Sequence, residues 1–349
     1  MQLVTNRILR ISLSSVAFLF CCMAAAAAAD PSSISQTNIF APQSTPAKSI
    51  LHLSILVLTI TGIIFVVVST LLVYSMSKFR AKSASANSEP AQVYGSTQIE
   101  LAWTIIPILI VVVLFVATAR GIHEIQDAPI PASAVQVTVI GHQFWWEYRY
   151  PQLGVVTANE LHIPVSDPAH PRPTFLQLLS ADTDHSFWVP VLAGKTDLIP
   201  NHPNRMWMDP QHTGIFIGQC AQYCGTQHAK MLLRVYGQSR GDFDTWVAQQ
   251  QQAEKRDAST EEGRSVFLRN ACINCHAIAG TVATGRFGPD LTHLAGRDTI
   301  ASGAVPNTPE NLRKWIDNPD QMKPGCLMPP MHLNDPDLNA VTAYLITLH

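Results

Sequence analysis

Two long apolar segments constrain the fold of this chain more than any other feature. Residues 50–74 and 101–119 contain no Asp, Glu, Lys or Arg. Each reaches the roughly 20 residues that an α-helix needs to cross a bilayer. Pro107 lies inside the second segment and should kink it, which membranes tolerate. We therefore predict a transmembrane helical hairpin over residues 50–119.

Basic residues between the two segments predict the orientation of this hairpin. Lys78, Arg80 and Lys82 follow the first segment, and short loops rich in Lys and Arg face the cytoplasm. Both ends of the hairpin and everything after Arg120 then lie outside the cytoplasm. We expect a two-pass protein of a bacterial inner membrane, with its soluble part on the periplasmic side.

The first residues have the pattern of a secretory signal. A basic start, the apolar run 11–23 and a polyalanine stretch follow one another, and this order is typical of a cleaved leader. We predict a signal peptide over residues 1–29, with cleavage after Ala29. The alternatives are lipid attachment at Cys21 or Cys22 and retention of the segment as a further anchor.

The soluble part is long enough for two domains. The chain has 349 residues and a formal net charge of −2, and one domain usually takes about 100–200 residues. The balanced charge gives no support to nucleic-acid binding, which would show as clustered Lys and Arg.

A compact β-sandwich is predicted for residues 130–246. Pro129 and Pro131 mark its start, and residues 135–139 alternate apolar and polar side chains, as a half-buried strand does. Short strands separated by proline and glycine suit a sandwich. Further β-rich stretches cover residues 174–179, 215–217 and 232–236.

A second soluble domain is predicted for residues 259–349. Residues 247–258 are polar and lack strand-forming side chains, so we interpret them as a linker or helix end. The closing segment carries apolar side chains at helical spacing, which indicates core packing. These side chains are Leu338, Val341, Tyr344, Leu345 and Leu348.

One loop gathers the ligands of a soft metal. Cys220, Cys224, His228 and Met231 follow one another within twelve residues. Thiolate, imidazole and thioether together favour copper over magnesium or calcium, and zinc gains little from methionine. Two cysteines favour a pair of bridged coppers over a single blue-copper ion. The loop lacks a second histidine, and His185 is the best upstream candidate.

A disulfide is the alternative for the two cysteines, since they face an oxidising compartment. It would leave His228 and Met231 without a reason to follow at this spacing. The other histidines of this region are interpreted as structural: His142, His162, His170, His202 and His212.

A second motif predicts covalently bound haem. Cys272 and Cys275, followed directly by His276, form the attachment pattern of c-type haem. The thiols add to the haem vinyl groups and His276 binds the iron. Met328, in a loop bounded by prolines, is our choice for the sixth ligand. The alternatives for that ligand are Met322 and Met331. A zinc fragment or a redox pair is the alternative for the motif.

These features together resemble subunit II of a caa3-type haem–copper cytochrome c oxidase. The matching stretches are residues 100–107, 141–146, 185–195 and the copper loop. The resemblance implies a transmembrane α-hairpin, a cupredoxin-like β-sandwich with a binuclear Cu-A centre, and an all-α class I cytochrome c domain. Two copper ions and one haem c are then the cofactors.

The resemblance also assigns the copper ligands. Cys220 and Cys224 bridge the two coppers, while the remaining ligands are terminal. These are His185, His228, Met231 as a weak ligand, and the backbone carbonyl of Gln222.

Gln222 departs from the family pattern. Glu is usual at this position, and its side chain helps to hold a magnesium ion at the boundary with subunit I. An amide oxygen is a weaker ligand for a hard cation, so we predict a weakened or absent magnesium site. Asp182 matches an acidic position of the family, whereas Asp184 stands where an apolar residue is usual.

Three aromatic residues form a candidate electron path. In relatives that take electrons from a separate cytochrome c, the tryptophan after Gly-His-Gln is the residue where electrons enter. Here that position is Phe144, so we expect the fused haem to be the main entrance. Trp145 is the alternative entrance, and Trp146 is predicted to pack beside the copper site.

The resemblance implies a role in respiration. Electrons would pass from an external donor, such as a cytochrome c or a bc complex, through haem c and Cu-A to subunit I, which reduces oxygen to water. Subunits I and III are the expected partners. The alternatives are a Cu-A subunit of a nitric oxide reductase and a non-enzymatic copper chaperone or redox sensor.

Overall fold

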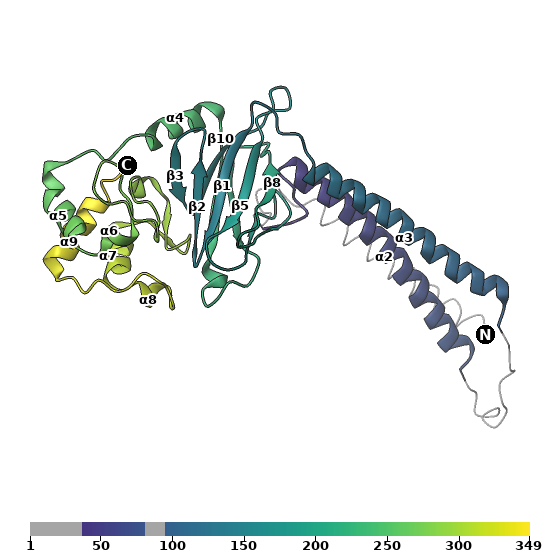
Figure 1. The fold of residues 1–349 in the computed structure, drawn as a ribbon. Coiled ribbons are helices and arrows are strands. Elements are labelled where there is room, and N and C mark those ends of the chain that lie inside the picture. Colours follow the sequence, from purple (N-terminus) through teal and green to yellow (C-terminus); the bar gives the residue numbers. More distant parts are fainter. Residues whose placement is uncertain (1–36, 81–94) are drawn as a thin grey trace.

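The computed structural model describes residues 37–80 and 95–349. The predicted signal segment 1–29 and Lys82 lie outside this part. The described chain runs from a long helical hairpin, through a β-sandwich, to a domain built mostly of helices (Figure 1).

The hairpin consists of α2 (Thr45–Lys78) and α3 (Thr97–Gln126). Both helices are long and apolar enough to cross a membrane. Most of their apolar side chains are exposed, and exposed apolar surface of this extent suits a lipid or protein neighbour. The two predicted helices are confirmed, and each extends beyond its predicted ends.

The sandwich holds the start of α2 through a residue far along the chain. Ser44, at the helix N-cap, makes no cap hydrogen bond of its own. Asp209 instead accepts hydrogen bonds from the Thr45 amide (2.6 Å), the Thr45 hydroxyl (2.6 Å) and the Ser44 hydroxyl (2.9 Å). A carboxylate at this end also interacts favourably with the helix dipole. At the end of α3, the Trp207 indole donates to the Ile125 carbonyl (2.9 Å).

The predicted β-sandwich is confirmed, and it consists of two five-stranded sheets. The first has the order β3-β2-β1-β5-β8 and the second β4-β10-β9-β6-β7. The first sheet consists of β1 (Val135–His142), β2 (Trp145–Tyr150), β3 (Val155–Ala158), β5 (Thr174–Ser180) and β8 (Asn204–Met208). The second consists of β4 (Glu160–Pro164), β6 (His185–Trp188), β7 (Thr196–Leu198), β9 (Gly214–Cys220) and β10 (Leu232–Gln238).

Alternation along the strands builds the sandwich core. Val135, Val137 and Val139 point inward from β1, while the residues between them are more exposed. β1 pairs with β5 in parallel and with β2 in antiparallel register. Because side chains alternate between the faces of a strand, one face of each sheet contributes to a single apolar cluster.

The C-terminal part of the chain first packs against the sandwich and then forms a separate domain with its own apolar core. α4 (Arg240–Gln250) packs Phe243 and Val247 into the sandwich, so the predicted linker begins within a helix. The next elements are α5 (Glu261–Arg269), α6 (Cys272–Cys275), β11 (Thr299–Ile300), β12 (Val305–Pro306), α7 (Pro309–Asp317), α8 (Pro319–Met322) and α9 (Asp335–Leu345). All five residues of the predicted terminal stripe are buried, which confirms their core role.

Candidate metal centres

Three strands of the second sheet position the copper loop. β6 begins at His185, β9 ends at Cys220, and β10 begins directly after Met231. β6 pairs with β9, and β9 with β10. The Cys220 amide donates to the Met231 carbonyl (2.9 Å), which closes the loop at its base. The sheet therefore brings His185 beside a loop that lies 35 residues later.

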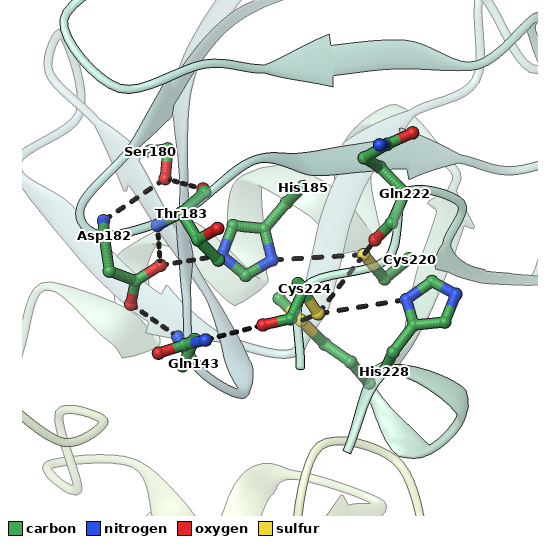
Figure 2. Close-up of polar contacts among 10 residues, drawn as sticks. Gln143, Ser180, Asp182, Thr183, His185, Cys220, Gln222, Cys224 and His228 are labelled. Carbon is green, nitrogen blue, oxygen red and sulfur yellow. Dashed lines mark hydrogen bonds and ion pairs between the residues drawn. The ribbon is translucent and has the colours of Figure 1, made fainter. Parts of the chain in front are cut away.

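The predicted copper ligands converge at this loop, and Figure 2 shows His185 directed toward Cys220. The Cys220 and Cys224 sulfurs lie 3.8 Å apart and are not bonded to each other. The His185 Nδ1 atom is 3.9 Å from the Cys220 sulfur, and the His228 Nδ1 atom is 3.8 Å from the Cys224 sulfur. The Met231 sulfur lies 3.9 Å from that of Cys224.

The Gln222 carbonyl completes this donor set. Its oxygen lies 3.1 Å from the Cys220 sulfur, while its side chain is exposed. Soft sulfur and imidazole donors gathered in a buried site fit copper. The residues present therefore fit the predicted group.

Outer contacts orient the ligands. Asp182 lies 2.8 Å from the Nε2 atom of His185, so Nδ1 remains directed at Cys220. Such a carboxylate partner fixes the ring orientation of a metal-binding histidine. Asp182 also accepts from the Gln143 amide (2.7 Å), and the Gln143 side chain donates to the Cys224 carbonyl (2.5 Å). Gly141 leaves room for the His185 ring, because an added Cβ would lie 2.8 Å from it.

The surroundings favour ionisation within the thiol pair. The hydrogen bond between the two sulfurs lowers the pKa of Cys220, against the effect of burial, and His185 adds to this lowering. Burial disfavours the charged form of His185, but the hydrogen bonds with Asp182 and Cys220 outweigh it and raise the pKa of the ring. A thiolate is the form that binds metal.

The haem motif lies on a short helix and its flank. α6 spans Cys272–Cys275, and His276 follows it. The His276 Nδ1 atom lies 2.7 Å from the Pro289 carbonyl, which leaves Nε2 as the ring atom for iron. Burial lowers the pKa of His276 and favours the neutral ring. Gly288 lies against the ring, and an added Cβ would come within 2.6 Å of it.

A cavity of about 270 Å³ lies beside this motif. Cys272, Cys275 and His276 line it, and Met328 and Met331 line it as well. Two thiols, an imidazole and a thioether around an apolar cavity fit a covalently attached haem. Met322 lies in α8 and does not line this cavity. The remaining apolar wall includes Phe267, Leu291, Ile316 and Val341.

The three aromatic residues of the candidate path are divided between the two sites. Phe144, in the turn between β1 and β2, and Trp145, the first residue of β2, line the haem cavity. Trp146 lies in the sandwich core, with its ring centroid 6.0 Å from that of His185. The aromatic segment therefore reaches from the haem side to the copper side.

Two further polar residues, which lie where the haem cavity meets the copper loop, were not indicated by the sequence. Gln227 and Lys323 both line the haem cavity and are each 3% exposed. Gln227 comes from the copper loop, and Lys323 from the loop that holds Met328. The hydrogen-bond partners of these two side chains lie about a hundred or more positions away in the sequence. No local sequence pattern could therefore have indicated them.

Three family models match the chain. Cytochrome C oxidase subunit II, transmembrane domain, matches residues 32–119. Cytochrome C oxidase subunit II, periplasmic domain, matches residues 168–237. Cytochrome c matches residues 260–349.

Bacterial proteins named cytochrome c oxidase subunit 2 match most of the chain. Cytochrome c oxidase subunit 2 of Alkalihalophilus pseudofirmus is 35% identical, over 88% of this chain and 89% of the relative. The protein of the same name from Bacillus sp. strain PS3 is 34% identical, over 77% and 80%. That from Bacillus subtilis is 29% identical, over 78% and 80%. With this extent of similarity and its converging copper and haem motifs, the chain belongs to the cytochrome c oxidase subunit II family, in the form that carries a C-terminal cytochrome c domain.

Proposed function

We propose that this chain accepts electrons from an external donor at haem c, passes them to Cu-A, and delivers them to subunit I for the reduction of oxygen to water. One observation carries the proposal. Residues of the sandwich and of the haem domain line one cavity, and that cavity borders the copper loop. Copper and haem iron each exchange single electrons when bound.

The chain's own residues would hold both groups with little rearrangement. Cys220 and Cys224 would supply thiolates shared by two coppers, and His185, His228, Met231 and the Gln222 carbonyl would be the other ligands. The β6, β9 and β10 strands fix this donor set, and the Asp182 carboxylate holds the His185 ring. Such preorganised geometry suits electron transfer, because the ligands need not move between oxidation states.

The haem would be held at four points. Cys272 and Cys275 would form the covalent bonds, and His276 and Met328 would bind the iron. The Pro289 carbonyl holds the His276 ring in place. A methionine opposite a histidine raises the reduction potential of haem iron, which suits acceptance of electrons from a respiratory donor.

The hairpin would anchor the chain beside its catalytic partners. The exposed apolar faces of α2 and α3 are suited to contact with subunit I, with subunit III and with lipid. Both hairpin ends adjoin the sandwich (Figure 1), and Lys78 and Arg80 lie at the other end. By the positive-inside rule, the soluble domains then lie on the periplasmic side of the inner membrane.

Cys220→Ser tests the copper assignment in the assembled oxidase. We expect the near-infrared signal of binuclear copper to disappear while the visible bands of haem c remain, because the thiolate bridge is lost. Copper analysis gives the count, and Cys326→Ser is the control for loss of a thiol elsewhere. Retention of two coppers and of their signal in the Cys220 variant would show that the bridge is wrongly assigned.

A Met328 variant tests whether haem c is the main entrance for electrons. If haem c is the main entrance, disrupting its ligation should slow oxidation of an external cytochrome c, while the copper signal stays intact. Full-rate oxidation by a variant with a disrupted haem would make the haem domain an accessory and Phe144 or Trp145 the entrance.

A further inference from the structure

Several hydrogen bonds join the haem domain to the sandwich, among them a pair between Leu232 and Ser302. Two further groups carry the inference. We call the first the carboxylate contact; it links Glu160 to Asp298 and Thr299. We call the second the loop contact; it links Gln227 and Phe144 to the segment that begins at Lys323. Neither group includes a predicted ligand of copper or iron.

Glu160 is the centre of the carboxylate contact. It begins β4 and is 2% exposed. Its carboxylate accepts hydrogen bonds from the Thr299 amide (2.9 Å), the Thr299 hydroxyl (2.6 Å) and the Asp298 amide (3.1 Å). Hydrogen bonds to an ionised acceptor are stronger than neutral ones. Two sandwich side chains reinforce the contact from β10: Arg234 donates to Thr299 (3.0 Å), and Tyr236 to Asp298 (2.6 Å).

The loop contact connects the two predicted metal loops. Gln227 directly precedes His228, and its side-chain amide donates to the carbonyls of Lys323 (2.7 Å) and Pro324 (3.0 Å). Lys323 begins the segment that leads to Met328. Its ammonium donates in return to the carbonyl of Phe144 (3.0 Å). Burial lowers the pKa of Lys323 to about 8.

We infer that Glu160 and Gln227 are positioning residues that hold the haem domain in one docked position on the sandwich. The inference rests on the proposed function. With both contacts in place, the spacing of the haem cavity and the copper loop is fixed. Transfer between them then needs no docking step.

Hydrogen exchange in the full chain within the oxidase complex tests the carboxylate contact. In Glu160→Gln an amide NH2 replaces one of the two carboxylate oxygens, so it faces the donors of either Thr299 or Asp298 and the contact loses protection. We expect the Asp298 and Thr299 amides to exchange about tenfold faster or more, as for loss of a buried charged hydrogen bond. Glu262→Gln is the matched control, since Glu262 is exposed and pairs with Arg269 within the haem domain. Thr299→Val provides a milder variant should Glu160→Gln misfold.

Electron transfer after rapid photoreduction of the haem provides the functional readout. The wild type should reduce copper in a single phase whose rate is independent of solvent viscosity. Glu160→Gln and Gln227→Leu should slow this phase and make it viscosity-dependent, with haem and copper spectra unchanged. Gln249→Leu, on the exposed face of α4, is the control for Gln227.

The outcomes separate the two proposals. If the wild type transfers no electrons from haem to copper, the proposed function fails. If it does, and both variants keep the wild-type rate, viscosity behaviour and amide protection, the positioning role of Glu160 and Gln227 is wrong.

Discussion

At the residue scale, Met328 and Met331 both line the haem cavity, so one substitution at each separates their roles. Met328→Ala should lower the haem reduction potential and remove the weak absorption band of a methionine–iron bond, because a thioether ligand raises the potential. Met331→Ala should leave both properties unchanged. Redox titration and visible spectra of the assembled complex provide the measurement, and the reverse pattern would move the ligand to Met331.

Gln222 determines a second prediction at this scale. Its carbonyl faces Cys220 while its side chain is exposed. Wild-type oxidase purified from cells grown with manganese should retain little bound manganese, since an amide oxygen is a weak ligand for hard cations. Gln222→Glu should increase retention, and Gln219→Glu, another exposed glutamine, should not. Stoichiometric, tightly held manganese in the wild type, measured by electron paramagnetic resonance, would contradict this.

The sequence indicates the metal ligands better than it indicates the residues that orient those ligands and position the domains. Cys220, Cys224 and His228 lie within one loop, so their spacing alone indicates a metal. Asp182 matches an acidic position of the family, but the sequence does not show that it contacts His185. Glu160 and Gln227 have partners 139 and 96 positions away, and nothing local distinguishes them from surface polar residues.

At the element scale, β2 holds a carboxylate whose ionisation stabilises the fold. Burial disfavours the charge on Glu147, but hydrogen bonds with His142 (3.0 Å) and Arg149 (2.6 Å) outweigh it and lower its pKa below 4.5. The stabilisation is present above the unfolded pKa and is lost as the pH falls through the folded one. Glu147→Gln should therefore destabilise the sandwich at pH 7 by about 1–3 kcal/mol.

Thermal unfolding across a pH series checks this effect. The difference between wild type and Glu147→Gln should shrink as the pH falls below about 4.5, because the carboxylate of the unfolded chain then takes up a proton while that of the folded chain stays charged to lower pH. A difference that stays constant down to pH 3 would mean that Glu147 acts through shape and neutral hydrogen bonds alone.

The start of α2 depends on Asp209. Asp209→Ala removes three hydrogen bonds at the first turn and should cost about 0.5–2 kcal/mol, the range for losing an N-cap. We expect a lower melting temperature of the solubilised chain with unchanged copper and haem spectra. Asp317→Ala, an exposed aspartate of α7, is the control, and an equal melting temperature for both variants would rule out the capping role.

At the scale of the whole molecule, elements were easier to predict than their arrangement. Hydropathy indicated both membrane helices, and alternation indicated strands such as β1. The polar residues 247–258 carry no period, so they showed a boundary but not how the flanking domains pack. That packing depends on single hydrogen bonds such as the one from Lys323 to Phe144, 179 positions apart.

The cap on α2 also has a consequence for the order of biogenesis. Asp209 follows Thr45 by 164 residues, and at roughly 5–20 residues per second it leaves the ribosome on the order of ten seconds later. The hairpin therefore enters the bilayer with its first turn open. Only a folded sandwich closes it. The membrane anchor of a newly made chain is therefore complete only after its soluble domain has folded. An assembly partner that binds the capped start of α2 would select fully folded chains.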